Sequence, residues 1–134
     1  MNFDRVEYDN LEELELMLSR EPHYAAYFVE PLQTEAGVVM PSEGYMKKAK
    51  DICHKHNVLL IADELHSGLG RTGKLLASDG KPDVVIIGES LGGGVYPVSA
   101  VLGPKRVMKV LTPGTHGSTF GGNPLGCVVA RSAI

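Results

Sequence analysis

The stretch Val58-Leu59-Leu60-Ile61-Ala62-Asp63 decides the fold, because it is an unbroken apolar run that ends in a carboxylate. Such a run is typical of a strand covered on both faces, as in parallel α/β sheets, whereas a strand with one wet face alternates. Similar apolar runs lie on both sides of it, and the predicted strands span residues 25–29, 58–63, 83–88 and 98–102. The sequence therefore predicts an α/β fold with a mostly parallel sheet and flanking helices.

Helices are predicted around these strands from apolar residues at helical spacing and from capping residue types. Asn10 caps the first helix and Pro22 ends it, while Ser42 and Asn123 cap later ones. The predicted helices span residues 11–19, 44–56, 104–111 and the segment after Asn123. This last helix stops without a C-cap or a polar tail, so we expect residues 1–134 to be an incomplete domain cut from a longer chain.

Composition excludes several classes of protein. The chain has 134 residues, 43% of them hydrophobic and 22% charged, with a net charge of -3. These values are ordinary for a globular domain and lack the basic footprint of a nucleic-acid binder. No apolar run approaches the ~20 residues that cross a membrane. Two cysteines, Cys53 and Cys127, lie far apart and predict reduced thiols in an intracellular protein.

Polar side chains follow three of the predicted strands. Gln33-Thr34-Glu35 follows the first, Asp63-Glu64-Leu65-His66 ends the second and Gly88-Glu89-Ser90 ends the third. In open α/β sheets, ligands bind at the carboxyl ends of the strands, so these clusters predict a shared site. Asp63 ends a wholly apolar strand and needs a cationic or donor partner, for which a protonated pyridine nitrogen is suitable. A capping or salt-bridging aspartate is the alternative.

Two glycine-rich loops are candidate phosphate sites. Residues 68–73 lack the GxGxxG and GxxxxGK[ST] orders, so their signal is weak. Residues 116–123 combine hydroxyls, free backbone N–H groups and a following helix N-terminus, which predicts anion binding, with a flexible connection as the alternative. The histidines lack the spacing of a metal site, and no metal is expected.

Taken together, these sequence segments resemble those of the class III aminotransferases, which belong to fold type I of the pyridoxal-phosphate (PLP) enzymes. Within that family, the resemblance is to the ornithine aminotransferases. The resemblance runs from about residue 8 to the end of the chain. It rests on residues 29–38, 62–73, 81–83, 92–100 and 116–125. It implies that the chain is the central part of a PLP-transferase large domain, without the N-terminal part and the C-terminal small domain.

The resemblance also implies roles for individual residues. Asp63 matches the aspartate that pairs with the pyridine nitrogen of PLP and keeps the ring an electron sink. His66 stands where the family usually has a glutamine beside the phenolic oxygen. Thr119 matches a threonine that reaches the cofactor phosphate of a neighbouring subunit, which implies a dimer. Glu35 matches a glutamate that helps ornithine aminotransferases choose between substrates.

Glu89 is the main departure from the family pattern, because it stands at the position of the Schiff-base lysine. That lysine links PLP covalently and moves a proton during the reaction. A glutamate has no amine, so covalent binding of the cofactor is expected to be lost. Thr34 replaces a glycine beside Glu35, and we expect strain there if its φ is positive. Several departures from the family pattern at one site, at Thr34, His66 and Glu89, suggest that selection on this site is relaxed.

The sequence therefore predicts a non-catalytic relative of ornithine aminotransferase. Two alternatives stay open: a portion of an active ornithine (omega-amino acid) aminotransferase, or a non-catalytic partner of a full-length aminotransferase subunit. The expected partner is a second copy or such a subunit, with no nucleic acid and no membrane. Residues 1–5 lack signal and transit features, which predicts a cytoplasmic protein, although the family leaves the mitochondrial matrix open.

Overall fold

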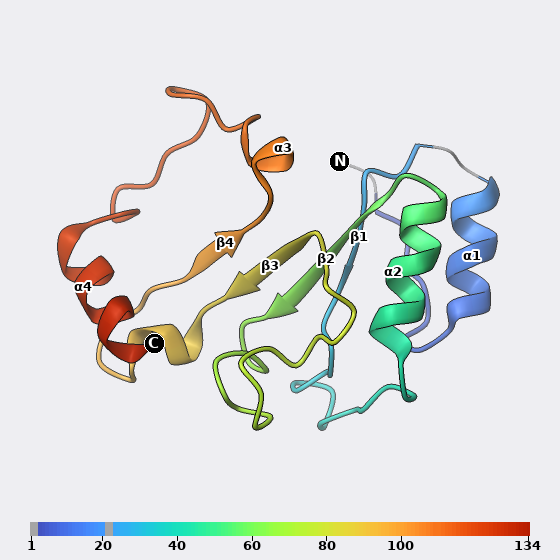
Figure 1. The fold of residues 1–134 in the computed structure, drawn as a ribbon, viewed down its shortest axis with the longest axis horizontal. Helices are drawn as coiled ribbons and strands as arrows, with labels where there is room; N and C mark the ends of the chain where they lie inside the picture. Colours follow the sequence, from blue (N-terminus) through green and yellow to red (C-terminus); the bar gives the residue numbers. More distant parts are fainter. Residues whose placement is uncertain (1–2, 21–22) are drawn as a thin grey trace.

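A four-stranded sheet forms the centre of the computed structural model, which describes residues 3–20 and 23–134 (Figure 1). Its strands lie in chain order: β1 (Ala26–Val29), β2 (Leu59–Glu64), β3 (Val84–Ile87) and β4 (Ala100–Leu102). The first three are parallel, and β4 pairs antiparallel with β3. The predicted mostly parallel α/β sheet is confirmed, with strand ends shifted by one or two residues.

Two helices cover the β1–β2 half of the sheet. α1 (Leu11–Arg20) and α2 (Tyr45–Lys55) lie side by side in Figure 1. Their apolar faces meet the strands in one core cluster of buried residues, namely Leu14, Leu18, Val29, Tyr45, Met46, Ala49, Cys53, Val58, Leu60 and Ala62. A smaller cluster of Val85, Ile87 and Leu91 packs under the other half. Most of the buried core therefore lies around β1 and β2.

The remaining elements lie beyond β3. A short 3-10 helix η1 (Glu89–Gly92) follows β3 directly, and α3 (Lys105–Met108) follows β4. The chain then runs away from the sheet before α4 (Pro124–Ala133), which lies near η1 (Figure 1). Among the described residues, no helix is long and apolar enough to cross a bilayer.

Two of the three predicted caps are confirmed. The Glu13 backbone N–H donates to Asn10 Oδ1 at 3.0 Å, and the Gly126 backbone N–H donates to Asn123 Oδ1 at 2.8 Å. The third prediction, Ser42, is wrong. The N-cap of α2 is Gly44, which makes no side-chain capping hydrogen bond, and the Ser42 hydroxyl donates instead to Asp9 Oδ1 at 2.8 Å, which holds this side chain toward Asp9. Pro22, the predicted helix end, lies outside the described residues.

Candidate functional site at the strand ends

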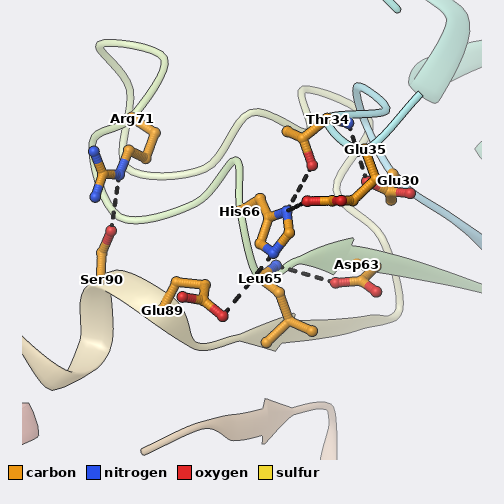
Figure 2. A network of polar contacts seen from close by, with 9 residues as sticks. All are labelled: Glu30, Thr34, Glu35, Asp63, Leu65, His66, Arg71, Glu89 and Ser90. Carbon is orange, nitrogen blue, oxygen red and sulfur yellow. Dashed lines mark hydrogen bonds and ion pairs between the residues drawn. The ribbon is translucent and has the colours of Figure 1, made fainter. Parts of the chain in front are cut away.

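The three predicted strand-end clusters meet at one edge of the sheet. Because β1, β2 and β3 are parallel, their carboxyl ends lie side by side, and Figure 2 shows Thr34, Asp63, His66 and Glu89 projecting there. The carboxylates of Glu30 and Glu35 lie at the same edge. The site is therefore rich in negative charge.

His66 lies in the middle of this group and joins all three strand ends. Its Nδ1 lies 2.6 Å from Thr34 Oγ1 and 3.9 Å from Glu35 Oε1, and its Nε2 lies 3.9 Å from Glu89 Oε1 (Figure 2). The Thr34 contact is a hydrogen bond. The two carboxylate contacts are long, and their side chains are exposed, so each stabilises the fold little.

Asp63 lies in the inner strand β2 and is partly buried. Its Oδ1 accepts a hydrogen bond from the Leu65 backbone N–H at 3.1 Å. This bond agrees with the alternative interpretation of Asp63 as a capping aspartate. Among the described residues Oδ2 makes no hydrogen bond or ion pair, so it stays available to a donor at the sheet edge.

Glu89 lies at the first residue of η1 with φ +34°, a conformation that non-glycine residues rarely adopt. Strain of this kind persists only where the surroundings impose it, and it clusters at functional positions. The strain considered for Thr34 depended on a positive φ, and Thr34 is not among the described residues with positive φ, so that condition is not met. Its hydroxyl lies 2.6 Å from His66 Nδ1.

An open hollow lies beside Glu89. It has a volume of about 640 Å³ and is lined by Leu65, Glu89 and residues 94–99. A second hollow of about 360 Å³ shares residues 97–99 and is lined on its other side by the 116–123 loop and the start of α4. The loop predicted to bind an anion therefore adjoins the Glu89 hollow. Thr119 itself is exposed, and among described contacts nothing joins it to the strand-end group.

Comparison with known proteins agrees with this geometry. The family description "Aminotransferase class-III" matches residues 4–134. The chain belongs to the class III aminotransferase family. Ornithine aminotransferase of Drosophila melanogaster, described as mitochondrial, is 56% identical over 98% of this chain. The chain spans only 31% of that relative's length.

Solved structures of aminotransferases show the same fold. Ornithine aminotransferase from Toxoplasma gondii, with PLP at partial occupancy in its active site, superposes with a TM-score of 0.95 and 53% identity. That match covers 99% of this chain and 32% of the Toxoplasma chain. Acetylornithine aminotransferase from Elizabethkingia anophelis gives a TM-score of 0.94 and 53% identity, over 98% of this chain and 34% of its own. The predicted family and fold class are confirmed.

The end of β3 carries a carboxylate at residue 89, which supplies no amine for condensation with an aldehyde. Together with Asp63 and Glu35 it makes this edge negatively charged. Among the described residues no group of histidine, cysteine, aspartate and glutamate side chains is arranged to hold a metal ion. The carboxyl ends of β1, β2 and β3 offer hydrogen-bonding side chains, among them Asp63, whose Oδ2 is free of hydrogen bonds within the described part of the chain.

One residue at this edge was not singled out from the sequence. Glu64, the last residue of β2, is buried, although Asp63 and Leu65 beside it are only partly buried and His66 is exposed. An Asp-Glu pair after an apolar strand gives no sign of which carboxylate turns inward. The alternation of burial along β2 decides it, because side chains on one face of that strand are buried.

Proposed function

We propose that this chain is an ornithine-aminotransferase-like part of a PLP-transferase large domain that neither links PLP covalently nor transfers amino groups by itself. The observation that carries the proposal is the carboxylate of Glu89 at the end of β3, beside the hollow that Leu65 also lines. The family resemblance assigns the Schiff-base lysine to this position. A carboxylate cannot condense with an aldehyde.

Residue 89 lies well inside the segment that matches the family. The proposal therefore extends to any longer protein that contains this segment, because flanking residues do not supply an amine at the end of β3. The chain spans about a third of its relatives' length, so the remaining parts of their large and small domains have no counterpart within residues 1–134.

The roles of the other site residues belong to the same proposal. PLP, when bound, supplies the electron sink of the family's chemistry. Asp63 is the residue that would accept a hydrogen bond from its ring nitrogen, and His66 would face its phenolic oxygen. Thr119 would contact the phosphate in a neighbouring subunit, and Glu35 would meet the amine-bearing substrate. The relatives' names point to ornithine or acetylornithine as the substrate class.

The test is a PLP titration followed by absorbance, with borohydride reduction and peptide mapping, on the wild-type chain and on Glu89→Lys. The wild-type chain is expected to give no visible imine band and no reduced PLP adduct. Glu89→Lys is expected to give both, with the adduct on residue 89. Glu35→Lys is the matched control, because it places a lysine at the same edge on an exposed side chain; it should give no specific adduct.

A wild-type adduct on a specific lysine would overturn the loss of covalent binding. Failure of Glu89→Lys to form the adduct, in a folded protein, would overturn the assignment of residue 89 to the lysine position. The two results are distinguishable because they come from different proteins and different peptides.

A second candidate function is that of a non-catalytic partner for a full-length aminotransferase. It is favoured by large apolar side chains that are exposed in α4 and in the segments just after η1 and just before α4. These are Val95, Phe120, Leu125 and Val128. Free monomers rarely expose several such side chains together. Co-expression with a tagged full-length ornithine aminotransferase should yield a co-purifying complex that Val128→Lys weakens. A strictly monomeric chain that never co-purifies would exclude this role.

A further inference from the structure

Glu64 is a buried carboxylate that the proposed function does not use. Its residue is 1% exposed. Oε2 accepts hydrogen bonds from Ser67 Oγ at 2.9 Å and from the Ala77 backbone N–H at 2.8 Å. Oε1 accepts from the Ser78 backbone N–H at 2.7 Å and from Ser78 Oγ at 2.5 Å. Each oxygen thus receives two donors, and no cation pairs with the carboxylate among the described residues.

A buried carboxylate without a cation is costly unless its lone pairs are filled. Here neutral donors fill them, and a carboxylate accepts such bonds more strongly than an amide oxygen does. The donors come from residue 67 and from residues 77 and 78, which lie near the two ends of the loop formed by residues 65–78. Glu64 therefore ties the base of the 65–78 loop to the end of β2.

Gly68 supports the same closure. Its backbone N–H donates to the Glu64 carbonyl at 2.9 Å, and a Cβ at position 68 would lie 2.8 Å from that carbonyl oxygen. Backbone this close cannot move aside as a flexible side chain does. The loop start is thus folded tightly onto Glu64, and only glycine fits.

The loop reaches the candidate site at three points. Leu65 packs against Gly88, where an added Cβ would lie 2.4 Å from Leu65 Cδ2. His66 faces Thr34 and Glu89, and Arg71 Nε donates to Ser90 Oγ at 3.2 Å (Figure 2). All three contacts fall on the segment that follows β1 or on the β3–η1 junction. A shift at the base of the loop would move all of them together.

We propose that Glu64 is the positioning residue of this edge: it fixes the 65–78 loop so that His66 and Arg71 face residues 89 and 90. Glu64 touches none of these groups itself and acts through the loop. The inference does not depend on whether Glu89 abolishes covalent PLP binding.

The test is native-state hydrogen exchange by mass spectrometry, with the His66 ring resonances followed by NMR and assigned through His66→Gln. Glu64→Gln keeps the side-chain volume but replaces one acceptor oxygen with a donor amide, which faces donors. Exchange across residues 65–78 is expected to rise at least tenfold, and the His66 resonances to shift, while α1 and α2 keep their protection. Glu12→Gln, an exposed carboxylate on α1, is the matched control and should change neither.

Ser78→Ala removes a single donor and keeps the carboxylate, so it is expected to give the same local pattern several-fold more weakly. It also serves as the test if Glu64→Gln does not fold. Unchanged loop exchange and unchanged His66 resonances in either folded variant would overturn the proposal. Uniformly raised exchange over the whole chain would overturn it as well, because that is the signature of general destabilisation without positioning.

Discussion

Asp83→Asn probes the electrostatic link that holds the sheet to its helices at the edge opposite the candidate site. The Asp83 side chain, just before β3, is 9% exposed. Oδ2 pairs with Lys50 Nζ on α2 and accepts from the Leu60 backbone N–H at 3.0 Å, while Oδ1 accepts from Arg106 Nη2 at 2.8 Å. Burial alone would raise the pKa of Asp83, but these hydrogen bonds lower it below its ordinary value.

The magnitude follows from what the substitution leaves behind. An amide keeps the shape but not the charge, so Lys50 loses its counter-ion in a partly buried place. Breaking a fully buried pair costs about 3–5 kcal/mol, and the partial exposure of Lys50 reduces this to roughly 2–3 kcal/mol. With a urea m-value of about 1–2 kcal/mol/M, the unfolding midpoint should fall by roughly 1–3 M. Arg106→Gln is the control, because Arg106 is 62% exposed and its loss should cost less than about 1 kcal/mol.

Far-UV circular dichroism is the suitable signal, since the chain has no tryptophan. The pH dependence supplies a second check. Because the folded pKa of Asp83 is depressed, its contribution is present above the unfolded pKa, near 4, and is lost as pH falls through the folded value. The gap between wild type and Asp83→Asn should therefore narrow below about pH 4. Equal midpoints at pH 7, or a gap that stays constant down to pH 2, would refute the reasoning.

Two further predictions follow from burial. Leu14→Ala should destabilise the folded chain by about 2–4 kcal/mol, because Leu14 is 1% exposed and lies in the main core. Leu16→Ala, at a residue that is 48% exposed, should cost less than about 1 kcal/mol. Similar urea unfolding midpoints for the two variants would contradict this. Burial raises the pKa of the Cys53 thiol to about 11, whereas Cys127 is exposed, so iodoacetamide at pH 8 should modify one cysteine in the native chain and both in urea. Native labelling of Cys53 at a rate similar to Cys127 would be the opposing result.

The sheet could be predicted from the sequence because its strands are unbroken apolar runs bounded by polar turns. Asn10 and Asn123 were predictable for a local reason: a side chain caps the helix that begins right after it. Ser42 failed for a non-local reason, since Asp9 is far away in sequence yet close in space. Local signals were reliable where no residue distant in sequence held the side chain away from its helix.

The site was predictable in part. The meeting of residues 33–35, 63–66 and 88–90 followed from parallel strand order alone. The burial of the Glu64 side chain could not be predicted in this way. It depends on which face of β2 is covered and on donors from residues 77 and 78. Those donors lie in a loop without regular structure, where spacing carries no information about contacts.

The structure also bears on the idea of relaxed constraint at this edge. Thr34, His66 and Glu89 are the three positions at which the family resemblance leads one to expect other residues. Side chains that drift independently have no reason to fit one another. Yet Thr34 Oγ1 and His66 Nδ1 are 2.6 Å apart, and the other ring nitrogen of His66 is the one that faces Glu89. The Thr34 hydroxyl, the His66 imidazole and the Glu89 carboxylate thus follow one another. In this order each neighbouring pair can place a hydrogen-bond donor against an acceptor. Any attempt to rebuild a lysine at position 89 therefore meets a histidine whose other nitrogen is already engaged by Thr34, so the three positions should be changed together as well as singly.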